Sequence, residues 1–111
     1  MPSVPSLGEF EQIVLLAILR LKDDAYGVSI RAEIAKRTGR EPASGALYTT
    51  LERLQRKGLL KSRVGEPTRQ RGGRAKRYYV VTAPGAAAVT RAQRAFRNML
   101  HGLKLPGDSL A

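Results

Sequence analysis

The chain has 111 residues, and its 20 Lys and Arg outnumber its nine Asp and Glu, which gives a formal net charge of +11 at neutral pH. This length accommodates one small domain, and the charge favours a polyanionic partner, above all nucleic acid. The absence of cysteine excludes disulfides and thiolate metal sites, and the longest apolar run, residues 13–19, is far shorter than the ~20 residues of a membrane span, so we expect a cytoplasmic protein without membrane contact.

The positive charge is concentrated in one segment. From Arg53 to Arg77 there are ten basic residues and one acid, Glu66, so the segment carries nine (ten minus one) of the eleven net charges. A polyanion would therefore bind mainly there.

The first predicted helix begins near Ser6 and extends to about residue 21. Ser6 and Glu9 have the spacing of a capping box. Apolar residues cover nearly the whole circumference of this helix, so several neighbours must bury it. It is either the central helix of the core or, in addition, the contact for a partner chain.

A second helix is predicted over about 25–37. Asp23 or Asp24 is a suitable N-cap, and Gly39 follows the helix where a left-handed residue ends it.

A third helix is predicted over about 45–57, with Ser44 as its N-cap and Gly58 after its end. Its leucines form an inward stripe, while the opposite face is polar and basic, with small residues in the first turn. Small residues allow backbone N–H groups to approach phosphates, so the face suits a DNA groove, although a solvated face has the same composition. The inward stripe comprises Leu47, Leu51 and Leu54.

Two strands are predicted at 59–64 and 78–82, joined by the polar link 65–74. The segment RQRGGRAKRYYVVT (residues 69–82) places basic residues and two glycines at the tip of this hairpin. Such a segment is either a solvated loop or a phosphate contact. By strand alternation, one of Tyr78 and Tyr79 must face inward.

The last predicted helix begins at the cap Thr82, with Pro84 in its first turn, and extends to about residue 104. Its apolar residues form a narrow stripe opposite a basic face. A second subunit or the chain itself closes this stripe, and the projecting position of the helix favours a second subunit.

The sequence contains no arrangement of residues suited to catalysis. The single histidine, His101, lies on the polar face of the last helix without a nearby partner, and the serines have no adjacent base. We therefore expect no enzyme activity, no metal and no cofactor.

The order of helix, helix, helix, strand, basic loop and strand is that of a winged helix-turn-helix, a mainly α fold with a small β-hairpin. In that fold the third helix enters the major groove and the loop is the wing.

Four segments resemble the PadR-like family of bacterial transcription regulators: LGEFEQIVLLAIL (7–19), YG (26–27), SGALYTTLERLQRKGLL (44–60) and GRAKRYY (73–79). The pairing of G-x-L-Y at the entry of the third helix with G-R-x-[KR]-[KR]-Y-Y in the wing strand is specific. One departure is Ala83-Pro84-Gly85, where relatives often carry glutamates.

This resemblance implies a homodimeric DNA-binding regulator, usually a repressor, whose operator binding is relieved by a small effector or a stress signal. It also implies the short subgroup with a single C-terminal helix, which pairs with the partner's N-terminal helix. The expected DNA contacts are Tyr26, Ser44, Gly45, Tyr48, Thr49, Arg53, Arg69, Arg71, Gly73, Arg74, Lys76 and Arg77. The expected dimer contacts are Leu7, Phe10, Val14, Val89, Ala92, Phe96, Met99, Leu100 and Leu103.

We thus expect a DNA-binding domain over 6–82, a dimerisation helix over 83–104, and flexible ends at 1–5 and 105–111. For Tyr48, half-buried packing is the alternative to a DNA contact. For the whole chain, the alternative functions are a basic RNA- or ribosome-binding module and a winged helix used for protein contact.

Overall fold

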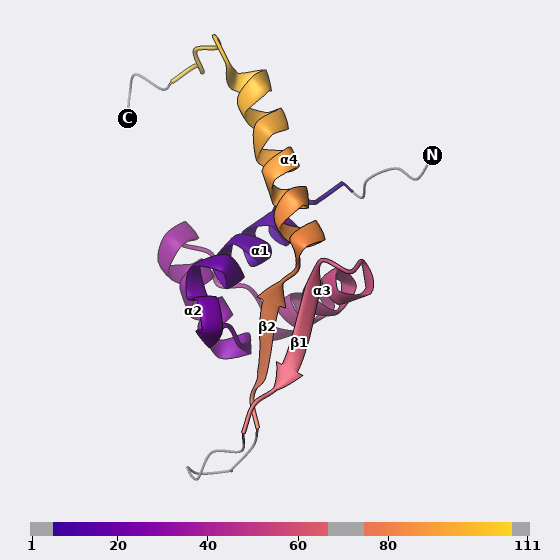
Figure 1. Cartoon of the computed structure of the whole chain (residues 1–111). Coiled ribbons are helices and arrows are strands. Elements are labelled where there is room, and N and C mark those ends of the chain that lie inside the picture. Colours follow the sequence, from indigo (N-terminus) through magenta and orange to yellow (C-terminus); the bar gives the residue numbers. More distant parts are fainter. Residues whose placement is uncertain (1–5, 67–74, 108–111) are drawn as a thin grey trace.

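The computed structural model describes residues 6–66 and 75–107, so the segments 1–5 and 108–111, expected to be flexible, lie outside the described residues. Helices and strands follow one another as predicted (Figure 1). They are α1 (Glu9–Leu21), a 3₁₀ turn (Lys22–Asp24), α2 (Gly27–Thr38), α3 (Ser44–Arg56), β1 (Leu60–Val64), β2 (Arg77–Val81) and α4 (Ala83–Leu100).

Helix α1 is the centre of the core, as predicted from its apolar circumference. It contacts α2, α3, β2 and α4. Leu16 and Leu19 nevertheless remain 38% and 43% exposed, so the described residues leave one face of α1 partly uncovered. The largest fully buried side chains are Val14, Leu15, Ile18, Ile30, Ile34, Leu47, Leu51 and Leu54.

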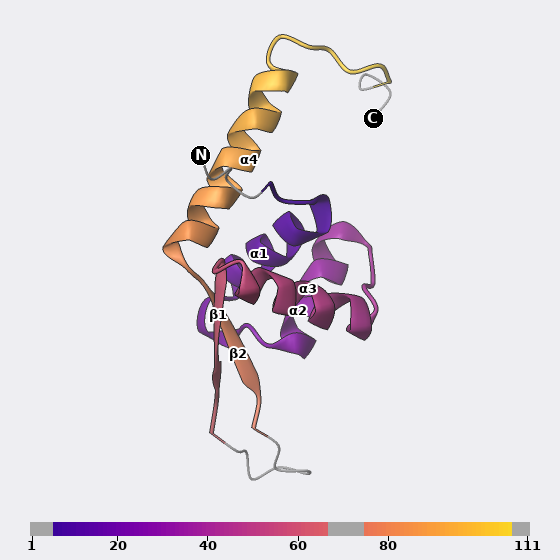
Figure 2. The ribbon, with the colours of Figure 1, turned by 90° about the vertical axis from the view of Figure 1, so that its right-hand side faces the viewer.

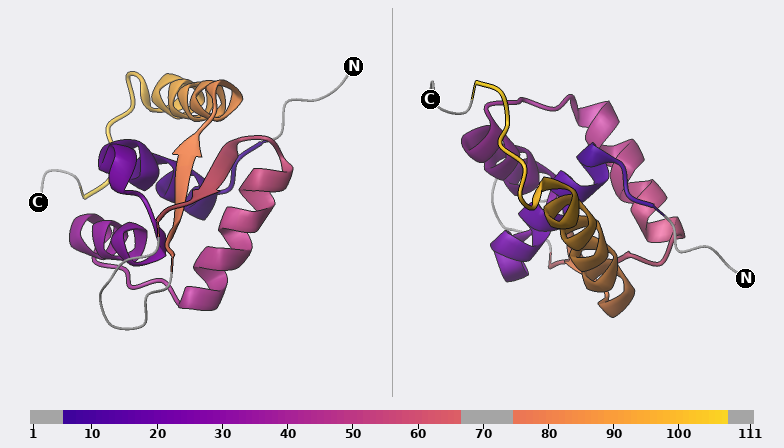
Figure 3. Two further views of the ribbon diagram at one scale, coloured as in Figure 1. Left: turned by 60° about the horizontal axis from the view of Figure 1, so that its bottom comes forward. Right: turned by 90° about the horizontal axis from the view of Figure 1, so that it is seen from above.

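The β-hairpin is antiparallel, with Leu60 opposite Val81 and Val64 opposite Arg77. Its strands lie between the α1–α2 side and α3 (Figure 3, left). The hairpin and α4 extend from the helical unit in opposite directions (Figure 2). This arrangement separates the wing from the C-terminal helix.

A third short strand segment, which the sequence does not predict, pairs with β2. Tyr26 forms an isolated antiparallel bridge with Tyr78, and the Tyr79 N–H donates to the Ala25 carbonyl at 2.8 Å. Tyr79 is buried and Tyr78 is partly exposed, which confirms that one of the two faces inward.

The predicted caps of the first two helices are wrong. Glu11, not Glu9, reaches back to the helix start, where its Oε1 accepts from the Gly8 N–H at 2.9 Å. At α2, the Tyr26 N–H donates to Ser29 Oγ at 2.9 Å, and the aspartates lie in the preceding 3₁₀ turn.

The predicted cap of the third helix is displaced by one residue. Ala43 is the N-cap of α3, and the hydroxyl of Ser44 instead accepts from Arg31 Nη1 at 3.1 Å. Thr82 caps α4 as predicted, because its Oγ1 accepts from the Gly85 N–H at 3.1 Å.

A glycine follows the end of α2, α3 and α4. Gly39 and Gly58 have φ values of +76° and +77°, in the left-handed region where glycine is unstrained, as predicted. Gly102, with φ of +75°, follows α4, so this helix stops at Leu100 rather than near residue 104, and Leu103 lies beyond it. None of the helices in the described ranges is long and apolar enough to cross a membrane.

Candidate nucleic-acid interface

The leucine stripe of α3 seats this helix in the core and leaves its first turn outward. Leu47, Leu51 and Leu54 are at most 1% exposed, whereas Gly45 and Thr49 are exposed. Apart from its chain neighbours and the backbone of its own helix, no described atom lies within 4 Å of a Cβ added at Gly45, so the first turn of α3 is open to an approaching backbone. Three expected DNA contacts, Ser44, Gly45 and Thr49, therefore share one accessible surface.

Arg31 fixes the entry of α3 relative to α2. Its Nε donates to the Pro42 carbonyl at 3.0 Å, and its Nη1 donates to Ser44 Oγ. The exposed Ser44 is thus held in place from the neighbouring helix.

Tyr48 both packs and remains accessible. Its side chain crosses the start of α2, where a Cβ added at Gly27 would lie 2.1 Å from the Tyr48 hydroxyl oxygen. Residue 27 is therefore glycine because the tyrosine fills the space of a side chain. Tyr48 stays 50% exposed, so the packing alternative and the expected contact are compatible.

Two tyrosines and two cations form the base of the wing. The rings of Tyr26 and Tyr78 meet edge to face at 5.6 Å. Lys76 Nζ lies 4.3 Å from the Tyr26 ring centre, and the Arg63 guanidinium lies 4.8 Å from that of Tyr78. These cation–π contacts orient two positive charges beside the N-terminus of α2.

Arg77 is tied to α3 through the hairpin. Its Nη1 donates to Ser62 Oγ at 3.0 Å, and the same oxygen accepts from Gln55 Nε2 of α3 at 3.0 Å. Lys76 and Arg77 therefore lie at the base of the wing, which is connected to α2 through the Tyr26–Tyr78 bridge and to α3 through Gln55. The other expected wing contacts, Arg69, Arg71, Gly73 and Arg74, lie outside the described residues.

Cations on the hairpin carry no paired acid within the described ranges. The ion pairs found there involve Arg20, Arg37, Arg40, Arg53 and Lys57, which belong to the helical unit. Among the described residues, Lys61, Arg63, Lys76 and Arg77 thus keep their charge available for an external anion.

Arg53 differs from the other expected contacts, because it forms an ion pair with the buried carboxylate of Glu11. Its Nη1 lies 3.8 Å from Glu11 Oε2, and Lys57 Nζ lies 2.9 Å from the same oxygen. The Glu11 side chain is only 7% exposed and joins the start of α1 to the end of α3. Arg53 therefore pairs with Glu11 while its side chain stays 47% exposed, and its contact with DNA stays a prediction.

Sequence reasoning missed Glu11 as a functional residue. Burial by itself would raise its pKa, but the Gly8 N–H, Lys57 and Arg53 together hold the pKa of Glu11 below its usual value. The sequence offers no clear signal for Glu11, because the same helix also carries Glu9, whose side chain is 80% exposed.

We expect Glu11→Gln to lower the free energy of unfolding by about 2 kcal/mol at pH 7, less than for a fully buried pair because Lys57 keeps 27% exposure. Since the pKa of Glu11 is lowered in the folded state, its contribution is present above the unfolded value of 4.5 and is lost progressively as the pH falls from there through the lower folded pKa. Urea denaturation at pH 7 and pH 3 measures this. Glu9→Gln is the control, because the Glu9 side chain is 80% exposed in its pair with Arg40. An equal effect of both substitutions would contradict the stabilising role of the buried Glu11.

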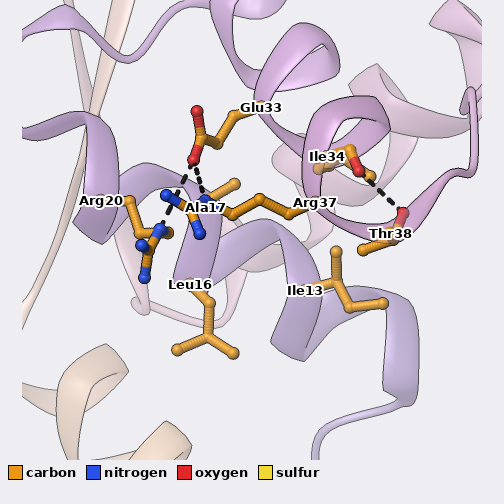
Figure 4. Close-up of a pocket in the computed structure, with 8 residues that line it drawn as sticks. All are labelled: Ile13, Leu16, Ala17, Arg20, Glu33, Ile34, Arg37 and Thr38. Carbon is orange, nitrogen blue, oxygen red and sulfur yellow. Dashed lines mark hydrogen bonds and ion pairs between the residues drawn. The ribbon is translucent and has the colours of Figure 1, made fainter.

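A shallow groove of about 230 Å³ lies between α1 and α2 (Figure 4). Ile13, Leu16 and Ile34 give it an apolar floor. At its rim Glu33 pairs with Arg37 and Arg20, and the hydrogen bond from Arg37 holds the pKa of Glu33 below its usual value. This groove belongs to the face of α1 that the described residues leave partly uncovered.

The expected dimer contacts divide into three groups by exposure. Val14 and Val89 are buried by their own chain, so they are core residues, which corrects their expected place in a partner contact. Leu7 and Phe10 pack partly against the core, and Ala92 is partly exposed. The exposed members are Phe96 (64%), Met99 (79%), Leu100 (39%) and Leu103 (59%). Own-chain packing thus closes the first half of the α4 stripe and leaves the second half open.

The chain is similar to known proteins over most of its length. Residues 15–91 match the model of the transcriptional regulator PadR-like family. A PadR family transcription regulator from Clostridium difficile R20291 is 27% identical with a TM-score of 0.66, over 81% of this chain and 90% of that one. A transcriptional regulator from Clostridium thermocellum shares the fold at 24% identity and a TM-score of 0.68, over 81% of this chain and 84% of that one. No curated protein sequence matches the chain.

Proposed function

The chain belongs to the PadR-like family of transcriptional regulators, and on that basis we propose that it is a homodimeric repressor that binds a specific DNA operator and is released by a small effector or a stress signal. We place its action in the cytoplasm. The observation that carries the proposal is the open first turn of α3 beside the unpaired cations of the wing base.

We propose that α3 reads the major groove from its first turn. Ser44, Gly45, Tyr48 and Thr49 lie on the surface that faces outward, and Arg31 and Gly27 hold it in position. The positive end of the helix dipole favours phosphates there. Residues 6–82 would form the DNA-binding domain.

The wing supplies the phosphate contacts in this proposal. Lys76 and Arg77, together with Arg69, Arg71 and Arg74, would bind the backbone beside the groove, where contacts position the protein without reading sequence. Tyr26 contributes through the ring that orients Lys76.

We propose that the dimer forms where the apolar stripe of α4 meets α1 of the partner subunit. Phe96, Met99 and Leu100 are exposed on one chain, and Leu16 and Leu19 are exposed beside the α1–α2 groove. Packing of these surfaces would bury apolar area that the single chain leaves in water. A two-fold dimer would bind a pseudo-palindromic operator.

Substitutions should separate the two kinds of DNA contact. We expect replacement of Arg74 and Arg77 by alanine to weaken binding to every duplex. The slope of log Kd against log salt should decrease in magnitude by about two for each protomer. Thr49→Ala should change the preferred sequence more than the affinity for random duplex. Fragments selected from genomic DNA, compared with random duplex and poly-RNA, provide the measurement. Equal effects on random DNA, or a preference for RNA, would contradict the proposal.

A further inference from the structure

The net charge of the chain lies in two separate zones. Residues 1–52 carry six basic and seven acidic residues, residues 53–77 carry a net +9, and residues 78–107 carry four basic residues and no acid. Asp108 completes the total of +11. The second zone therefore consists of α4 and the turn that follows it.

Three exposed arginines lie on one face of α4. Arg91, Arg94 and Arg97 follow one another at intervals of three residues, and all three are exposed. Like charges at this spacing on a helix repel each other. The helix dipole favours a cation only in the last turn, which accounts for Arg97 but not for Arg91 or Arg94. Their repulsion would be relieved by a bound polyanion.

The arginine face is centred opposite the apolar stripe. At about 100° per residue, Arg91, Arg94 and Arg97 lie roughly 140°, 160° and 100° around the helix from Phe96, so a partner on the stripe leaves Arg94 in solvent. Arg91 and Arg97 flank that contact, and Arg91 borders the groove that Phe96 also lines. Helix α4 and the wing also lie at opposite ends of the molecule (Figures 1 and 2). A ligand on this face would not compete with DNA at α3.

We propose that the face formed by Arg91, Arg94 and Arg97 is a second docking surface for duplex DNA, which lets an operator-bound regulator hold a second DNA segment. All three cations are arginines, whose planar guanidinium groups bind phosphates with two hydrogen bonds. An interfacial membrane helix inserts an apolar face into the lipid. In the proposed dimer the partner subunit covers the apolar stripe of α4, so the helix has no free apolar face to insert. The geometry therefore favours a duplex over a lipid surface.

The second contact is weak and sensitive to salt. Three neutralised phosphates give a slope of about −2.7 in log K against log salt, which corresponds to roughly 40-fold weaker binding at 200 mM than at 50 mM salt. The proposed contacts are to phosphates, which carry no sequence information, so we expect the face to accept any sequence.

A capture assay tests the proposal. An operator duplex is immobilised, saturated with protein, washed, and offered a labelled random duplex at 50 and 200 mM salt. We expect the native chain to capture the second duplex at 50 mM and to lose it at 200 mM. The triple variant R91Q/R94Q/R97Q should bind the operator within about twofold of the native chain but capture at least tenfold less of the second duplex.

The triple variant K22Q/K36Q/R40Q removes the same charge from exposed positions in residues 1–52, outside both positive zones, and it should capture like the native chain. Undiminished capture by the α4 variant would overturn the inference, because bridging would then run through the two reading helices of a dimer. No capture by the native chain, or retention of anionic vesicles in place of duplex, would also overturn it. In each case binding of the immobilised operator shows separately whether the proposed function stands.

Discussion

Replacing Phe96 and Leu100 with aspartate is expected to give a folded monomer whose affinity for a two-half-site duplex is at least about 100-fold lower. Both side chains are exposed in the single chain, at 64% and 39%, so the charges do not disturb its core. In the proposed dimer the same positions are buried, where an unpaired carboxylate is strongly unfavourable. Losing the linkage between two reading helices removes the gain from binding both half-sites together.

Sedimentation velocity and fluorescence anisotropy on the same samples measure these effects. The matched control is the double variant Ala87→Asp with Asn98→Asp, which adds the same two charges to exposed positions of α4 on the face opposite Phe96. This control should stay dimeric. A Phe96 and Leu100 variant that remains dimeric would place the interface elsewhere.

Gly85→Ala is expected to lower the free energy of unfolding by about 2 kcal/mol, although alanine is the better helix former. A Cβ at this position would lie 2.2 Å from the Leu59 carbonyl oxygen and 2.8 Å from Val81 Cγ1. The Leu59 carbonyl already accepts the Thr82 N–H at 3.1 Å, so it cannot retreat without loss of that bond. The close approach outweighs the gain in helix propensity.

Gly45→Ala provides the control, because this glycine lies in the first turn of another helix with open space around it. It should leave stability unchanged or raise it by up to about 1 kcal/mol. Equal stability of the two variants in urea denaturation would show that the contact at Gly85 is not limiting. The contact also explains the glycine in Ala83-Pro84-Gly85.

Much of the fold was predictable because local signals and tertiary packing agree. The leucine stripe of α3, the glycines after α2 and α3, and the alternation in the hairpin all predicted what the structure contains. The caps of α1 and α3 were not predictable from local spacing. At these helix starts the side chains also bond to residues distant in the sequence: Glu11 accepts from Lys57, and Ser44 accepts from Arg31.

The candidate site was predictable in composition but not in arrangement. Residue types and order placed the basic hairpin after the third helix. The bridge between Tyr26 and Tyr78, and the packing of Tyr48 over Gly27, depend on how α2 approaches the hairpin and α3. No periodicity in the sequence encodes those approaches.

The most direct measurement is the salt dependence of binding to a duplex selected from genomic DNA. A dimer that neutralises six to ten phosphates should give a slope of about −5 to −9 in log K against log salt, with tighter binding to the selected duplex than to random duplex at every salt concentration. A slope near zero, or equal affinity for selected and random duplexes, would contradict a sequence-specific DNA-binding regulator.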